Sequence, residues 1–167
     1  SEIRQSLAFI DRARGQLAAK GQAYGAVKVG AMIEVPAAAL MVDVFLKYFD
    51  FLSVGTNDLI QYTLAIDRVD ESVSHLYDPM HPAVLQLLAR TIEAGHAQGK
   101  TVSVCGELAG DVTMTRLLLG LGLRSMSMHP SQVLAVKQQV LRSDTRKLRK
   151  LALAALAAEE PALVMAG

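Results

Sequence analysis

Segments with apolar residues at helical spacing alternate along the chain with short runs that are apolar almost throughout. In the first segment, residues 1–21, apolar residues lie three, four or seven positions apart and Gly21 closes the pattern, which predicts an amphipathic helix. Four later runs predict strands, because each is short and bounded by Gly, Pro or polar residues. They cover residues 26–35, 49–55, 100–106 and 125–129.

Helical segments are predicted between and after these strands. They cover residues 37–48, 82–99 and 113–122, a segment opened by Pro130, and residues 143–160. Strands separated by helices are typical of an α/β fold with a parallel sheet and right-handed crossovers. Four such units are half of a (β/α)8 barrel, which needs about 250 residues. An open doubly wound sheet is the alternative, and the pattern alone does not separate the two.

Composition narrows the class of protein. Of the 167 residues, 51% are hydrophobic, so the chain can bury a substantial core and disorder is excluded. The net charge of +1 gives no reason to expect nucleic acid or a membrane surface as a partner, and no run is long enough for membrane insertion. The single cysteine excludes an internal disulfide and a multi-cysteine zinc site. We expect a cytoplasmic domain, and the start at Ser1 without Met suggests part of a longer chain.

Every predicted strand has polar or reactive residues at or just after its end. In chain order these are Glu34, then Asn57 with Asp58, then Cys105 with Glu107, then His129. The carboxyl ends of parallel strands lie at one edge of the sheet, where α/β proteins place their sites. Gly, Asn and Asp also favour turns for backbone reasons, which accounts for one such ending more easily than for four. The pattern therefore predicts a converging set of functional side chains.

Two carboxylates in this set suit a hard cation. Mg²⁺ is usually held by one or two carboxylates, and substrate phosphate and water complete its shell. Glu34 and Asp58 therefore form a candidate magnesium site. The alternatives are a Glu34 that forms a salt bridge inside the sheet and an Asp58 that caps a helix, since "TNDL" is a fair helix start.

Residues 57–81 form a connection too long for an ordinary loop. It contains Arg68, whose guanidinium can bind phosphate with two hydrogen bonds, although an isolated arginine is more often solvated. Cys105 precedes Gly106 at a strand end. A lone cysteine is usually an inert core residue, but at the mouth of a charged pocket it can act as an acid or nucleophile. Taken alone, the residues favour an inert Cys105 and a solvated Arg68.

Four long motifs are specific enough to compare with a known family. They are "GAMIEVPAAALMVD", "DFLSVGTNDLIQYTLAIDR", "LYDPMHPAVLQLL" and "CGELAGD". With the residues around them, from about 27 to 142, they resemble the C-terminal phosphoenolpyruvate-binding domain of enzyme I of the bacterial phosphotransferase system, possibly in a fused multiphosphoryl form. The resemblance implies transfer of phosphate from phosphoenolpyruvate to a histidine on an N-terminal domain and on to the carrier HPr during sugar uptake. It also implies Mg²⁺, a homodimer, and strands five to eight of a (β/α)8 barrel.

The resemblance assigns roles to five residues. It implies that Glu34 and Asp58 bind the metal and that Asn57 contacts phosphoenolpyruvate. It implies that Arg68 holds the phosphate and that Cys105 is the acid that protonates the enolate of pyruvate.

The chain also departs from the family. The family has Ser at the position of His129, and residues after Arg142 match poorly. The arginines of the earlier strands and the phosphohistidine domain are absent, so we expect this chain alone to be inactive. Two rivals stay open: a domain of a phosphoenolpyruvate synthase or pyruvate phosphate dikinase, and a non-catalytic dimerising half-barrel. A half-barrel is also expected to leave two sheet edges and an apolar interior face uncovered.

Overall fold

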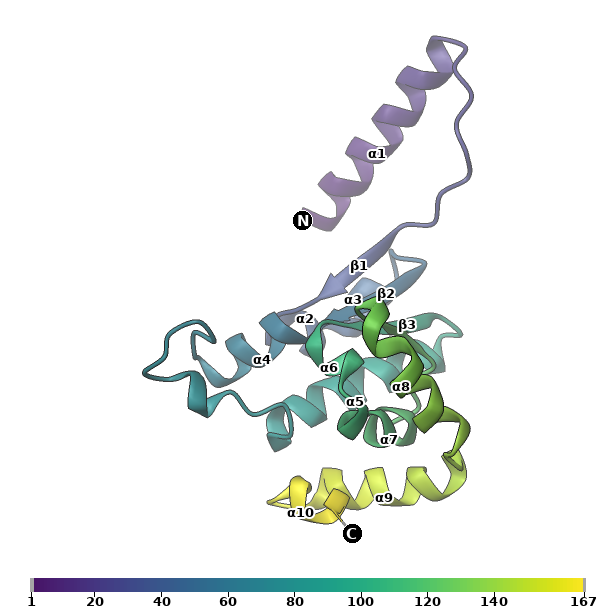
Figure 1. The fold of residues 1–167 in the computed structure, drawn as a ribbon. Coiled ribbons are helices and arrows are strands. Elements are labelled where there is room, and N and C mark those ends of the chain that lie inside the picture. The colour runs from purple at the N-terminus through teal and green to yellow at the C-terminus, as the bar shows by residue number, and fades with distance from the viewer. Residues whose placement is uncertain (1, 167) are drawn as a thin grey trace.

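The computed structural model describes residues 2–166 and contains one sheet of four parallel strands (Figure 1). The strands are β1 (Gly30–Ile33), β2 (Phe51–Gly55), β3 (Thr101–Cys105) and β4 (Ser125–Ser127). Their spatial order is β1-β2-β3-β4, so each strand is added beside the one before it. A doubly wound sheet reverses its strand order at a switch point, whereas a barrel adds strands in sequence. The α/β fold is confirmed, and its strand order is consistent with half of a barrel.

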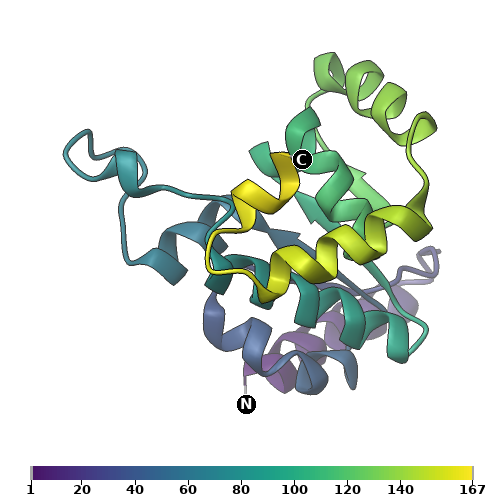
Figure 2. The ribbon, with the colours of Figure 1, turned by 90° about the horizontal axis from the view of Figure 1, so that it is seen from below.

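The helices lie before, between and after the strands along the chain. They are α1 (Glu2–Ala19), α2 (Pro36–Leu40), α3 (Val42–Leu46), α4 (Thr56–Leu64), α5 (Pro82–Ala97), α6 (Glu107–Gly110), α7 (Val112–Gly120), α8 (Pro130–Leu141), α9 (Thr145–Ala157) and α10 (Pro161–Ala166), with a short 3-10 turn η1 (Ser74–Leu76). Helix α1 projects away from the body, whereas α9 lies at the opposite end of the molecule (Figures 1 and 2). Helix α9 packs on α7 and also contacts α5.

The hydrophobic core lies between one face of the sheet and these helices. Ile33, Val54 and Val104 are neighbours across β1, β2 and β3, and all three are fully buried. On α5, Leu85 and Leu88 are fully buried in the same cluster. Alternation along each strand sends these residues to one face and their sequence neighbours to the other.

The other face of the sheet differs from the expectation of an apolar surface. One row across it consists of Met32, Ser53, Ser103 and Ser125, and the next row contains Gly55, Cys105 and Ser127. Small and polar side chains therefore predominate on this face, although Met32 is exposed. Such a face leaves room and hydrogen-bonding groups beside the strand ends.

Three predicted boundaries were wrong for local reasons. The first strand begins at Gly30 and not at residue 26, because pairing with β2 starts there and Asp50 binds both backbone groups of Val29. The helix predicted over 37–48 is interrupted at Met41, whose φ of −99° and ψ of 22° separate α2 from α3. The long connection opens with a helix, α4, which ends in a left-handed Ala65 at φ 54°.

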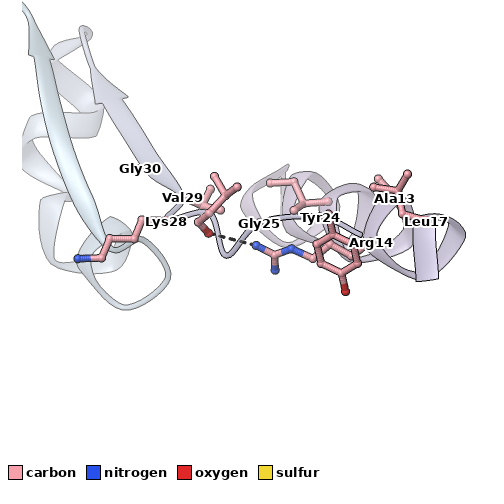
Figure 3. Close-up of a pocket in the computed structure, with 10 residues that line it drawn as sticks. Ala13, Arg14, Leu17, Tyr24, Gly25, Lys28, Val29 and Gly30 are labelled. Carbon is pink, nitrogen blue, oxygen red and sulfur yellow. Dashed lines mark hydrogen bonds between the residues drawn. The ribbon is translucent and has the colours of Figure 1, made fainter. Parts of the chain in front are cut away.

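An apolar pocket of about 470 Å³ lies between α1 and the segment that leads into β1 (Figure 3). Arg14 Nη2 donates a hydrogen bond to the Val27 carbonyl oxygen at 3.2 Å across it. The pocket contains no carboxylate or cysteine, so the candidate chemistry lies elsewhere. Among the described residues, no helix has both the length and the apolar character to cross a membrane.

Candidate functional site

A polar pocket of about 200 Å³ lies at the carboxyl ends of β1, β2 and β3. It is lined by Met32, Glu34, Gly55, Thr56, Asn57, Asp58, Cys105 and Gly106. Residues from three strand ends therefore meet here, whereas the predicted contribution of His129 from the fourth strand end was wrong, because its ring caps α8. Thr56 is fully buried, and its Oγ1 donates a hydrogen bond to the Cys105 carbonyl oxygen at 2.9 Å. This bond ties the start of α4 to the end of β3.

The two carboxylates of the pocket have surroundings that fit a magnesium site. Among residues 2–166, Glu34 forms no ion pair, and the N-cap of α4 is Gly55, which makes no side-chain cap. Asp58 lies in the first turn of α4 and does not cap it. A Cβ on Gly55 would lie 3.1 Å from Glu34 Oε2, so the glycine lets this carboxylate rest on the end of β2.

The donor set of the pocket also indicates which cation would fit. The described part of the chain contains no cluster of three or more His, Cys, Asp or Glu side chains that could hold a metal. Mg²⁺ takes one or two carboxylates and completes its octahedron with water and phosphate oxygens. Glu34 and Asp58 therefore fit Mg²⁺ in a site that substrate helps to complete.

Asn57, Arg68 and Glu107 form a hydrogen-bonded group at the edge of this pocket. Glu107 Oε1 lies 3.2 Å from Arg68 Nη1 and accepts a longer bond of 3.5 Å from Asn57 Nδ2. The Glu107 backbone N–H donates to Asn57 Oδ1 at 3.2 Å. Gly106 has φ +104°, and a Cβ there would lie 2.9 Å from Asn57 Oδ1, so this close approach requires glycine. Arg68 reaches the site although it follows α4 in the long connection.

The Cys105 thiol lies on the open face of the sheet and not in the core. The residue is half-buried and lines the pocket. Its Sγ accepts a hydrogen bond from Ser53 Oγ at 3.6 Å and lies 3.4 Å from the Val54 carbonyl oxygen and 3.7 Å from Met32 Sδ. The thiol therefore has a hydrogen-bond donor and two acceptors beside it.

Tyr77 is a neighbour of the site to which the sequence assigned no role. The side chain is half-buried and packs against the core. Burial raises the pKa of its phenol above the ordinary value of 10.0, and the negative charge of Glu107 adds to this rise while Arg68 opposes it. Glu107 and Thr56 were likewise left without a role. In the sequence, the only indication of a role for Glu107 or Thr56 was a position within two residues of a strand end.

We expect Tyr77 to make stability fall at high pH. Because the folded pKa is raised, the folded chain keeps the phenol proton at pH values where the unfolded chain loses it. Stability from Tyr77 is complete below about pH 10 and is lost as pH rises through the folded pKa. In Tyr77→Phe this loss should disappear, so urea denaturation above about pH 10 should favour the variant relative to the wild type. Tyr62→Phe, an exposed site, is the control, and parallel curves for Tyr77→Phe and wild type would contradict the expectation.

His129 lies outside the pocket. Its Nδ1 accepts a hydrogen bond from the Ser131 backbone N–H at 3.4 Å and lies 2.8 Å from Ser131 Oγ, so the ring caps the start of α8. His81 caps α5 in the same way. Arg142 ends α8, and the other basic residues up to position 150 lie on α9. The buried side of α9 is formed by Leu148, Ala152 and Ala155. These features are structural in the described chain.

Comparisons with known proteins identify the family of the chain. Residues 1–145 match the family described as "PEP-utilising enzyme, PEP-binding domain", and the chain belongs to this family. The chain is 59% identical over 162 residues to a phosphoenolpyruvate-protein phosphotransferase of Cupriavidus necator, covering 96% of the chain and 28% of that protein. Relatives of the same name in Lactococcus lactis and Enterococcus faecalis are 45% and 46% identical, over 93% and 90% of the chain and 27% and 26% of their own lengths.

These matches confirm the resemblance seen in the motifs and extend it. The family match includes α1, which lies before the motif region of residues 27–142. The alignment with the Cupriavidus necator protein covers 162 residues and so reaches beyond that region. The chain spans about 28% of the length of this relative, so the match covers only that part of the relative.

Proposed function

We propose that this chain is the phosphoenolpyruvate-binding part of a phosphoenolpyruvate-protein phosphotransferase. One observation supports this proposal best. Asn57 and Arg68 both contact the Glu107 carboxylate oxygen, beside a pocket that is lined by two further carboxylates, Glu34 and Asp58. Two groups that converge on one oxygen anion are suited to bind an anionic substrate, and two nearby carboxylates are suited to a cation. The names of the relatives favour this function over a phosphoenolpyruvate synthase or a pyruvate phosphate dikinase.

In this proposal each side chain has a defined task. Glu34 and Asp58 hold Mg²⁺, and Arg68 with Asn57 binds the phosphate of phosphoenolpyruvate. The chemistry that Mg²⁺ supplies when bound is neutralisation of phosphate charge. When the bond between phosphorus and the enol oxygen breaks, the phosphoryl group goes to a histidine. The Cys105 thiol then gives its proton to the methylene carbon of the enolate, which forms the methyl group of pyruvate.

The histidine that receives the phosphoryl group, and HPr as the next acceptor, belong to the proposed reaction of the full-length protein. We use "full-length protein" for the longest natural polypeptide that carries these residues. Incubation of this protein with phosphoenolpyruvate labelled on phosphorus, Mg²⁺ and HPr should label both proteins with phosphohistidine, which is lost in acid and retained in base. Labelled HPr supports the proposal. Pyruvate formation that requires a nucleotide would support a dikinase or synthase, and no reaction at all would support a non-catalytic module.

The proposal includes a cytoplasmic homodimer in which the four strands are strands five to eight of a (β/α)8 barrel. The sequential parallel order of the strands supports the barrel. Edge strands β1 and β4 expose unpaired backbone groups in the separate chain, which favours association with other chains. The 167-residue chain should therefore associate in sedimentation experiments or unfold without a sharp transition. A monodisperse monomer with one sharp, reversible thermal transition would contradict the half-barrel.

A further inference from the structure

Glu107 is the residue at the strand ends that the proposed function leaves without a task. Its Oε1 lies 3.2 Å from Arg68 Nη1 and 3.5 Å from Asn57 Nδ2. The two proposed phosphate-binding residues therefore both contact the same carboxylate oxygen. An anion already lies where these donors converge.

Among residues 2–166, the Glu107 side chain makes no hydrogen bond or ion pair other than these two. It is 78% exposed, while the Arg68 side chain is 37% exposed. The backbone N–H of Glu107 donates to Asn57 Oδ1, and this bond does not depend on where the carboxylate lies. Exposed ion pairs contribute little to stability, so the carboxylate can leave Arg68 at small cost while the backbone stays in place.

Repulsion between negative charges disfavours binding of the Glu107 carboxylate and a phosphate to these donors at the same time. The phosphate of phosphoenolpyruvate carries up to two negative charges at neutral pH and binds the arginine fork with two hydrogen bonds. A carboxylate at hydrogen-bonding distance from the same guanidinium nitrogen would repel it, because like charges at this separation disfavour one another. Entry of the phosphate therefore requires the Glu107 carboxylate to move.

We propose that Glu107 is an internal competitor for the substrate phosphate. Its carboxylate occupies the anion position between Arg68 and Asn57 and leaves when the phosphate of phosphoenolpyruvate binds. The contact keeps both donors in place before substrate arrives and lowers the apparent affinity for phosphate. The inference rests on the proposed function, because it takes Arg68 and Asn57 as the phosphate-binding groups.

The test compares Glu107→Gln with wild type in the full-length protein with Mg²⁺. Glutamine keeps the length of the side chain and an oxygen acceptor for Asn57 but removes the charge. Calorimetric titration with phosphoenolpyruvate should give a Kd about two- to fivefold lower in Glu107→Gln, the range expected from loss of one exposed ion pair. An unchanged or higher Kd would overturn the proposal and give Glu107 a purely structural role, because such a role would weaken binding when removed.

Two further variants separate this inference from the proposed function. Glu71→Gln removes the same charge from the connection that contains Arg68; Glu71 is exposed and forms no ion pair among the described residues. Its Kd should equal the wild-type value, and a matching decrease would attribute the effect to general charge and overturn the proposal. Arg68→Gln should weaken binding at least about tenfold. If Arg68→Gln binds normally, the proposed site is wrong; if only Glu107→Gln fails its expectation, the site stands without the competitor.

Discussion

Glu34→Ala and Asp58→Ala should each lower Mg²⁺-dependent turnover of phosphoenolpyruvate by at least about 100-fold in the full-length protein. Each change removes half of the carboxylates that line the pocket. The fold should stay intact, because neither side chain is fully buried and neither forms an ion pair in the described chain. Initial rates at several Mg²⁺ concentrations, with circular dichroism, measure both effects.

A matched control variant tests whether the loss of turnover is specific to carboxylates in the pocket. Glu71→Ala removes an exposed carboxylate from the connection after α4, outside the pocket, and should keep wild-type turnover. High Mg²⁺ should restore part of the activity of Glu34→Ala or Asp58→Ala if the lost group is a ligand. Wild-type turnover in both variants would show that these carboxylates do not hold the metal.

Cys105→Ala should bind phosphoenolpyruvate and Mg²⁺ almost as well as wild type, while its turnover falls by about 100-fold or more. The thiol acts after the phosphate has left, so it contributes little to binding. An unprotonated enolate can recapture the phosphate, so pyruvate formation should fall more than loss of phosphate to the histidine. Pyruvate formation per folded enzyme, together with a denaturation curve, provides the measurement.

The alternative for Cys105 gives a different pattern. If the thiol only packs, its removal should cost about 1–3 kcal/mol of stability and leave the turnover of folded enzyme unchanged. Ser103→Ala is a matched control, because Ser103 lies two residues earlier on the same open face and its Oγ bonds to the Leu52 carbonyl oxygen and not to the thiol. Destabilisation of Cys105→Ala with full turnover would contradict the role as acid.

The sequence located the strands well because each is a short apolar run with a clear end. Residues 51–55, 101–105 and 125–127 all fall inside predicted runs, and the strand ends meet as parallel pairing requires. The helix at 56–64 was missed because Gly55, Asn57 and Asp58 also suit a turn. Its end at Ala65 could not be predicted, since a left-handed alanine is held by the surrounding fold and not by its own preference.

The chemistry of the site was predicted less completely. Glu34, Asp58 and Cys105 could be found because each lies at or within three residues of the carboxyl end of a strand, and this position determines which edge of the sheet they reach. The partners of Arg68 could not be found in this way. The chain between Asn57 and Arg68 turns back after α4, and only the three-dimensional structure brings Arg68 within 3.2 Å of Glu107. The same holds for Ser53, whose contact with the Cys105 thiol depends on strand register.

The location of the substrate is tested most directly by the alkylation of Cys105. In the full-length protein, iodoacetamide labelling of the peptide that contains Cys105 can be followed by mass spectrometry with and without ligands. Phosphoenolpyruvate together with Mg²⁺ should slow this labelling strongly, because the thiol lines the same pocket as Glu34 and Asp58. The protection should be weak without Mg²⁺ and should be lost in Arg68→Gln. Labelling at the unprotected rate under saturating phosphoenolpyruvate and Mg²⁺ would contradict the placement of the substrate in this pocket.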